Sequence, residues 1–357
     1  MTRTLLLALL ALVAPALPAA ALSYGEVNTT LVDEVVVPAY ERYAAATSRL
    51  PGSIEALCAS PDMARLDAAQ QAWREAMLAW QHAQPIGFGP VADQGLAPQI
   101  EFWPDKHGTA GRQFSQALAD RDPALLEPDH LAGQSVGLTS LVSLERLLFG
   151  DEVLDPDGGD YACAYALAIA RHQARLADAL AKAWNGAGGF RSVVAGADTG
   201  NDVFFSAYDP AAALYRSLAD TLDGAIQVKL EPAMGDSLDA ARGRRAENWR
   251  SQMELASIAA NLETARALYA TPGGFGDLYQ ALGGDPAVDQ QVRAGFEQAL
   301  QTAQAIPLPL AEAVEDPAAR EQVQQLVDQL KQLRELVRGP VVAALGLSIG
   351  FNATDGD

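Results

Sequence analysis

Apolar residues recur three and four positions apart along most of this chain, and this spacing restricts the fold more than any other feature. The clearest stripe runs from residue 323 to residue 337, with Gln, Asp, Lys and Glu between its members. Its members are Val323, Leu326, Leu330, Leu333 and Val337. Such a stripe lies on one face of an α-helix and packs against other helices. Gly339-Pro340 follows it and predicts the end of that helix.

The same spacing recurs in seven further segments, and no alternating run long enough for a sheet stands out. The expected helices cover residues 31–50, 64–80, 134–149, 161–184, 211–229, 237–269 and 287–305, besides residues 318–337. The sequence therefore predicts an all-α protein, most simply two helical bundles of the four-helix type packed together.

Glycine and proline residues mark the expected joints between these helices. The segment 185–189 is glycine-rich and opens an irregular stretch that ends near Asp202. We place a domain boundary there, with residues 22–190 and 191–357 as the N-terminal and C-terminal helical-bundle domains. A second irregular segment, residues 84–111, is rich in Pro and Gly. Long loops of this kind are often functional, although a plain crossover between bundle helices would explain it equally well.

The N-terminus has the pattern of a secretory signal peptide. Arg3 precedes an apolar run from Leu5 to Leu17, and the alanines at 19–21 offer a cleavage site. Residues 1–21 are therefore expected to be removed, which predicts a soluble, exported, periplasmic protein. An uncleaved membrane anchor is the alternative, but two prolines in this region disfavour a spanning helix. No later segment is apolar for the roughly 20 residues that a transmembrane helix needs.

Export changes the interpretation of the two cysteines. Cys58 and Cys163 are the only cysteines in the chain, so an oxidising compartment predicts a disulfide between them. Two buried free thiols are the alternative.

The charge balance excludes one class of partner. The chain has 25 Lys and Arg against 45 Asp and Glu, a net charge of −20. Binding to nucleic acid depends on clustered cations, so nucleic acid is not expected as a partner. The acidity agrees with a protein that handles cations, and equally with any soluble exported protein.

Catalytic motifs are scarce. The chain has four histidines and neither an HExxH motif nor a P-loop. His107 is the only histidine in the long loop, where it could bind a metal or simply face solvent. Residues 133–137 match G-x-S-x-G, but that motif works on a strand-to-helix turn and no sheet is expected here.

Glu145 is the most informative polar residue, because it lies in the apolar segment 141–149. A buried carboxylate needs a charged partner, hydrogen bonds or a metal ion. Arg146 is its sequence neighbour and should point elsewhere on the helix, so the partner should come from another segment. Arg250 and Ser251 are the candidates. A structural ion pair would explain the same pattern.

Several blocks of the chain, in order, resemble the imelysin family, which is grouped as peptidase M75. The matching blocks are residues 72–80, 87–90, 100–104, 144–150 and 163–165, and residues 345–357 at the end. The resemblance covers nearly the whole mature chain. It implies two helical-bundle domains with a site at their interface, and an association with bacterial iron uptake.

The resemblance also implies a metallopeptidase signature, GxHxxE, from which this chain departs. Aligned on Glu145, the glycine position is Ser140 and the histidine position is Val142. Valine has no lone pair, and a hydrolytic zinc site needs about three protein ligands and an open position. Only the glutamate of the signature remains.

The leading hypothesis is a non-catalytic periplasmic binding protein associated with iron acquisition. It would use an acidic cleft between the domains, with Glu145 and nearby polar groups holding a ligand or a metal ion such as iron or zinc. Iron-uptake components of the cell envelope are the expected partners. One alternative is a metallopeptidase that recruits His107 or Glu101 as ligands. The other is an adaptor that binds another envelope protein.

Overall fold

The computed structural model describes residues 22–150 and 159–348 and is all-α, as the periodicity predicts. The predicted signal peptide, residues 1–21, lies outside the described residues, as does the chain from residue 349 onward. No β-strand occurs within the described ranges. In these same ranges, no helix is both long enough and apolar enough to cross a membrane.

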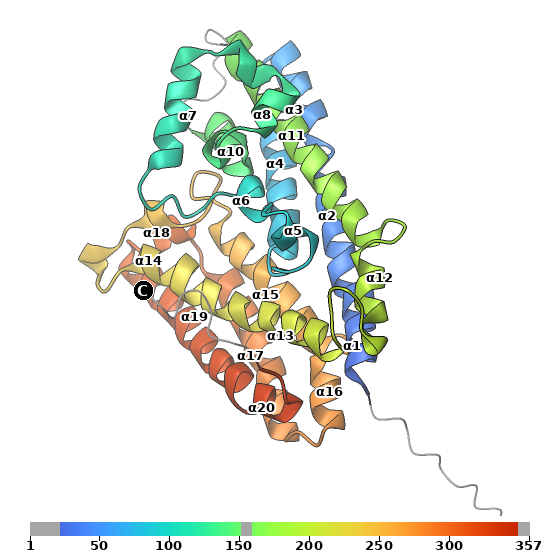
Figure 1. Ribbon diagram of the computed structural model, residues 1–357. Coiled ribbons are helices and arrows are strands. Elements are labelled where there is room, and N and C mark those ends of the chain that lie inside the picture. Colours follow the sequence, from blue (N-terminus) through green and yellow to red (C-terminus); the bar gives the residue numbers. More distant parts are fainter. Residues whose placement is uncertain (1–21, 151–158, 349–357) are drawn as a thin grey trace, which may run out of the picture.

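Two sets of four long helices form the body of the protein (Figure 1). The first set consists of α2 (Val37–Thr47), α3 (Leu50–Ala59), α4 (Met63–Ala83) and α11 (Gly159–Asn185). The second set consists of α13 (Tyr208–Asp223), α15 (Glu254–Ala270), α17 (Pro286–Ala305) and α19 (Pro317–Leu336). We call them the first and the second bundle. They meet chiefly where α4 packs against α15, and the N-terminal helix α1 (Tyr24–Leu31) packs against α13.

Shorter helices connect the long ones. Those between α4 and α11 are α5 (Pro90–Asp93), α6 (Ala97–Ile100), α7 (Thr109–Asp120), α8 (Pro128–Ala132), α9 (Val136–Thr139) and α10 (Leu141–Phe149). Those after α11 are α12 (Phe190–Ala195), α14 (Glu231–Met234), α16 (Phe275–Ala281), α18 (Leu310–Ala313) and α20 (Val342–Leu345). Short 3₁₀ turns are η2 (Pro123–Leu126), η3 (Gly196–Thr199), η5 (Leu238–Ala240) and η6 (Gly243–Arg245). The domain boundary after residue 190 stays a prediction, and it falls at the start of α12.

Three segments adopt the wider π-helical winding, which is rare and often found at functional sites. They are η1 (Val32–Val36), η4 (Gly224–Leu230) and η7 (Val337–Val341). The segment η7 corrects one expectation: the helix does not stop at Gly339-Pro340. The π turn accommodates Pro340, and the chain stays helical until Gly346, which takes a left-handed conformation with φ 65°. The apolar stripe on α19 is buried as predicted.

The expected helix over residues 237–269 is wrong in its first half. Regular helix begins only at Glu254, and residues 235–253 form turns and short 3₁₀ segments. Gly243 explains part of this, because a Cβ there would lie 2.0 Å from the carbonyl oxygen of Ala311. The backbone thus passes directly against another segment, a contact that a regular helix with side chains would not permit.

The expected helix over residues 134–149 is interrupted once. Ser135 caps α9, with its hydroxyl 3.4 Å from the Gly137 nitrogen, so the G-x-S-x-G match starts a helix without a preceding strand. Ser140 then adopts an extended conformation, and its hydroxyl accepts a 3.4 Å hydrogen bond from the Ser143 nitrogen to cap α10. Serine suits this position because its side chain replaces a missing backbone acceptor.

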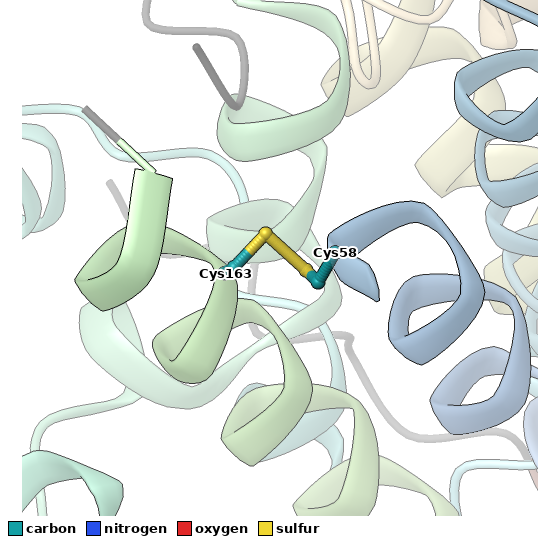
Figure 2. Close-up of a disulfide and its surroundings, with 2 residues drawn as sticks. All are labelled: Cys58 and Cys163. Atoms are coloured by element: carbon teal, nitrogen blue, oxygen red, sulfur yellow. A yellow bond between two sulfur atoms is a disulfide. The ribbon is translucent and has the colours of Figure 1, made fainter. Parts of the chain in front are cut away.

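The predicted disulfide between Cys58 and Cys163 is confirmed (Figure 2). It joins α3 to α11, with 5.7 Å between the two Cα atoms and 105 positions between the residues in the sequence. The link therefore ties the start of α11 to a helix formed 100 residues earlier, inside the first bundle.

Candidate functional site

A cavity of about 1030 Å³ is lined by segments from both halves of the chain, and we call it the interdomain cavity. Its walls come from residues 102–110, from residues 137–146 on α9 and α10, from residues 227–232 at the end of η4, and from residues 244–250 before α15. The first two segments precede α11 and the last two follow α13. Both halves of the chain therefore contribute to one hollow, which is a common place for a ligand site.

All three positions of the degenerate signature face this cavity. Ser140 caps α10, and Val142 and Glu145 follow on the side of that helix that lines the cavity. Residues three apart are neighbours on a helix surface, which explains why Val142 and Glu145 line the same wall. The side chain of Glu145 is nevertheless only 1% exposed.

Ser251 holds the Glu145 carboxylate from the second half of the chain. Glu145 Oε1 accepts hydrogen bonds from the Ser251 nitrogen at 3.0 Å and from the Ser251 hydroxyl at 2.8 Å. Burial raises the pKa of Glu145, while the bonds from Ser251 and the nearby charges of Arg250 and Arg146 lower it. Arg146 does not point away, as the sequence suggested, but lines the same cavity.

Two strained residues bracket the segment that carries Ser251. Asn248 and Gln252 have φ angles of 53° and 58°, which residues other than glycine rarely adopt. Such conformations persist only where the surrounding structure enforces them, and they cluster at binding and active sites. Here they place Trp249 and Arg250 on the cavity wall while Ser251 turns toward Glu145.

Glu101 lies behind the cavity wall in a buried hydrogen-bond network. Its Oε2 accepts bonds from Trp80 Nε1 and Gln81 Nε2, each at 2.8 Å, and from Gln84 Nε2 at 2.9 Å. Its Oε1 accepts a 3.2 Å bond from Asn248 Nδ2, which crosses from the second half of the chain. Burial, then the negative charge of Glu247, raise the pKa of Glu101 to about 8.

Lys229 is the charged centre of the same network. It lies on the π-helix η4, and its Nζ is 2.7 Å from Glu247 Oε2. It also donates to Gln81 Oε1 at 2.8 Å, to Gln84 Oε1 at 3.1 Å and to Asn261 Oδ1 at 2.6 Å. The network therefore joins α4 of the first bundle to η4 and α15 of the second through charged and amide groups.

Glu254 adds a third buried carboxyl near the cavity. It is the first residue of α15, and its Oε1 accepts a 3.2 Å bond from the Ala311 nitrogen. Its Oε2 has no hydrogen-bond partner among the described residues. Burial is the main cause that raises the pKa of Glu254 to about 7, and the charge of Glu145 adds to it.

His107 stands apart from these groups. Its side chain is exposed, and the cavity wall includes its neighbours Lys106 and Gly108 but not His107. Its backbone carbonyl accepts a 2.8 Å bond from Arg112 Nη1. Of the five candidate residues, the structure thus brings Glu145, Ser251 and Arg250 together, links Glu101 to them through Asn248, and leaves His107 outside.

The side chains around the cavity do not fit a metal site built by the protein alone. Within residues 22–150 and 159–348, no group of three or more His, Cys, Asp and Glu side chains is arranged to hold a metal ion. Val142 occupies the histidine position, and Glu145 already accepts two hydrogen bonds from Ser251. A structural or catalytic zinc site needs three or four such ligands.

The charge of the cavity corrects the expectation of an acidic cleft. Among the described residues, five cationic side chains line its wall, against the two carboxylates of Asp105 and Glu145. The five are Lys106, Arg146, Arg244, Arg245 and Arg250. Net charge is a sum over the whole surface, so it says little about one concave region.

Sequence reasoning missed most of the buried network, including Lys229, Glu247 and Asn248. A lysine inside the apolar run Ala225–Leu230 was an available signal, because a buried ammonium needs partners. Gln81 and Gln84 carried no such signal, since glutamine is ordinary on a helix surface. Gly243, Arg244 and Arg245 lie within residues 237–269, which the sequence predicts as one helix, so nothing in the sequence marked them as special.

Comparisons with known proteins agree with this architecture. The model of the imelysin family, Peptidase M75, matches residues 36–337. Iron-regulated protein A of Synechococcus elongatus is 26% identical over 298 residues, which cover 81% of this chain and 78% of that protein.

Two solved structures share the fold. An imelysin-like protein from Psychrobacter arcticum 273-4 has a TM-score of 0.76 and 20% identity, covering 94% of this chain and 99% of that one. A structure assigned to an iron-regulated protein A precursor from Parabacteroides distasonis has a TM-score of 0.73 and 16% identity, covering 92% and 97%. Because the family model spans most of the length and the two-bundle fold agrees, this chain belongs to the imelysin family.

Proposed function

We propose that this chain is an exported, non-catalytic binding protein of iron acquisition and that the interdomain cavity is its ligand site. The observation that carries the proposal is the placement of Glu145. The carboxyl is retained at the wall of a cavity of about 1030 Å³ and is held there by Ser251 from the other half of the chain. Residues from both halves of the chain converge on a volume suited to a small molecule.

The replacement of the signature histidine by Val142 supports binding rather than hydrolysis. A metallopeptidase must hold its metal with about three side chains and leave one position open for water. Val142 supplies no ligand, and the carboxyls nearest the cavity are already engaged by Ser251, by backbone groups or by the buried network. The signature glutamate would then contribute to ligand binding and to the join between the halves of the chain.

The iron role is supported by the relative from Synechococcus elongatus, whose name describes it as iron-regulated. Export is supported by the signal-peptide pattern at residues 1–21 and by the disulfide between Cys58 and Cys163, which persists in oxidising compartments. We infer a periplasmic location, with iron-uptake components of the envelope as partners.

Equilibrium dialysis with radioactive iron tests the proposal directly. The purified protein is dialysed against ferric citrate, and bound iron is counted for the wild type, Glu145→Ala and the control Glu75→Ala. Glu75 is an exposed acid on α4 that pairs with Arg49, so its loss should not change binding. We expect saturable binding in the wild type and the control, and weaker binding in Glu145→Ala, because Ser251 loses the carboxylate that holds the segment with Trp249 and Arg250 on the cavity wall. Absence of saturable binding in the wild type would overturn the proposal.

A parallel assay addresses the peptidase alternative. The same protein samples are incubated with an unfolded protein substrate, with and without a chelator. We expect no cleavage above a mock-purified control. Chelator-sensitive cleavage that disappears in Glu145→Gln would instead establish a metallopeptidase with an altered ligand set.

A further inference from the structure

We propose that the interdomain cavity binds an organic polyanion through its arginines, so that iron reaches this protein as an anionic ferric chelate of carboxylate ligands. The anion site stands on the geometry of the cavity alone. The identity of the cargo as ferric iron rests on the proposed function.

The distribution of charge is the first argument. In the whole chain, acidic residues outnumber Lys and Arg by 45 to 25. On the part of the cavity wall that the structure describes, the order is reversed, with five cations against two carboxylates. A concave wall of one sign concentrates the field and raises the local concentration of oppositely charged ligands. A bare cation would be repelled from this wall, whereas an anion would be attracted to it.

The two acids on the wall already have partners that limit their effect on the cations. Asp105 caps the start of α7, with Oδ1 accepting from the Thr109 nitrogen at 2.9 Å and Oδ2 from the Gly111 nitrogen at 3.1 Å. Glu145 accepts both hydrogen bonds from Ser251 on its Oε1. Among the described residues of the wall, both carboxylates are therefore hydrogen-bonded, and the five cations outnumber them.

An aromatic residue holds two of the arginines in place. The guanidinium carbon of Arg250 lies 4.4 Å from the ring centroid of Trp249, and that of Arg244 lies 5.0 Å from the same ring. A guanidinium over an aromatic ring is attracted by the ring's π-electrons and presents N–H groups along its edge. Those edges match carboxylates with two parallel hydrogen bonds, which a lysine cannot supply.

The size and the aromatic lining of the cavity indicate an organic ligand rather than an inorganic ion. The volume of about 1030 Å³ lies at the upper end of the range for small-molecule sites. Arg146, Arg244, Trp249 and Arg250 also line an adjoining hollow of about 540 Å³, whose lining includes Glu312 and Glu315. Phe102 and Trp103 add apolar surface to the wall of the interdomain cavity. A chelate with several carboxylates around a metal ion fits both the charge and the volume.

Such a ligand also agrees with the finding that the described side chains around the cavity form no metal site. The carboxylates that coordinate ferric iron would come with the chelate, so the protein needs no metal ligands of its own. Carboxylate and other oxygen ligands suit hard cations. The replacement of the signature histidine by Val142 then removes nothing that recognition of a chelate requires.

Calorimetric titration separates the two parts of the inference. The probes are citrate, ferric citrate, gallium citrate and, without oxygen, ferrous sulfate. The variants are Arg244→Gln with Arg245→Gln, both exposed, and the control Arg171→Gln, an exposed arginine on α11 outside the cavity. Thermal unfolding of each variant shows whether the fold is unchanged.

We expect ferric and gallium citrate to bind the wild type and the control equally. We expect binding to the double variant to be weakened at least about tenfold, since two charge-assisted contacts are lost. Binding should also weaken as salt is raised from 50 to 500 mM.

Each contrary result has one meaning. Iron binding that is unchanged in the double variant, or ferrous binding that exceeds binding of ferric citrate, overturns the anion site and leaves the iron role standing. Free citrate that binds as tightly as its ferric complex, and depends on the arginines, supports the anion site and overturns the iron cargo. Absence of binding by every probe overturns both.

Discussion

Lys229 and Glu247 form a buried ion pair in which 2.7 Å separates Nζ from Oε2, and their side chains are only 9% and 2% exposed. The lysine also donates to amide oxygens on α4 of the first bundle. The pair therefore lies within a junction between the bundles, next to the wall of the interdomain cavity. Its chemistry leads to the first of four predictions.

Replacing Lys229 with Met should destabilise the protein by about 3–5 kcal/mol, because Glu247 would remain buried without its counter-charge. Urea unfolding followed by circular dichroism measures this loss. The control is Lys331→Met, which removes an exposed pair with Glu231 and should cost about 1 kcal/mol or less. Equal losses in the two variants would contradict a special role for the buried pair.

The pH dependence of stability should report on Glu101. Its folded-state pKa of about 8 lies above the ordinary value of 4.5, so folding favours the protonated form. The stabilising contribution is complete below about pH 4.5 and is lost as the pH rises through about 8. In Glu101→Gln, the decline in unfolding free energy between pH 5 and pH 9 should become smaller by about 2–4 kcal/mol.

The control for this experiment is Glu127→Gln, an exposed acid at the start of α8, which should leave the pH profile unchanged. A remaining decline near pH 7 is expected from Glu254, whose raised pKa has the same sign. A profile that is identical in the wild type and Glu101→Gln would show that Glu101 does not titrate in this range.

The hydroxyl of Ser251 should contribute measurably to stability. Ser251→Ala removes the 2.8 Å bond to Glu145 and should cost about 1–3 kcal/mol, as expected for a buried hydrogen bond to a carboxylate. Ser257→Ala is a matched control, because Ser257 is fully buried and its hydroxyl has no partner within the described residues. Its removal should be neutral or slightly stabilising, and a comparable loss at both positions would refute the assignment.

The disulfide should be a major source of stability. Replacing both Cys58 and Cys163 with Ala should lower the free energy of unfolding by about 4–5 kcal/mol, because a loop of about 100 residues is released in the unfolded state. Reduction of the wild type should give the same loss, and a reductant should have no effect on the double variant. If reduction leaves the urea midpoint of the wild type unchanged, the link is not stabilising.

Local patterns in the sequence predicted the features that depend on local geometry. The stripe on α19, which ends at the first residue of η7, follows from the 3.6-residue helical repeat, and all five of its members are buried. The disulfide followed from having only two cysteines, which left a single pairing. The segment 237–253 misled because its alanines and leucine favour helix, whereas the contact of Gly243 with Ala311 and the left-handed Asn248 and Gln252 prevent it.

The candidate site could be predicted only in part. The sequence predicts Glu145 as a site residue, because it is a carboxyl in an apolar helix, and predicts Arg250 and Ser251 as candidates to contact it. The pairing of Lys229 with Gln81 spans 148 positions, and that of Glu101 with Asn248 spans 147. No periodicity connects residues at such separations, because their approach depends on how two bundles pack.

The amino-acid sequence by itself determined most of the long helices, the disulfide and the family, since each follows from spacing, residue type or a shared pattern along the chain. The tertiary structure alone decided the character of the cavity. Although the chain carries a net charge of −20, its folding gathers five cations on one concave wall. Charge acts through space rather than along the chain, so the sign of a cavity depends on which side chains the fold brings together.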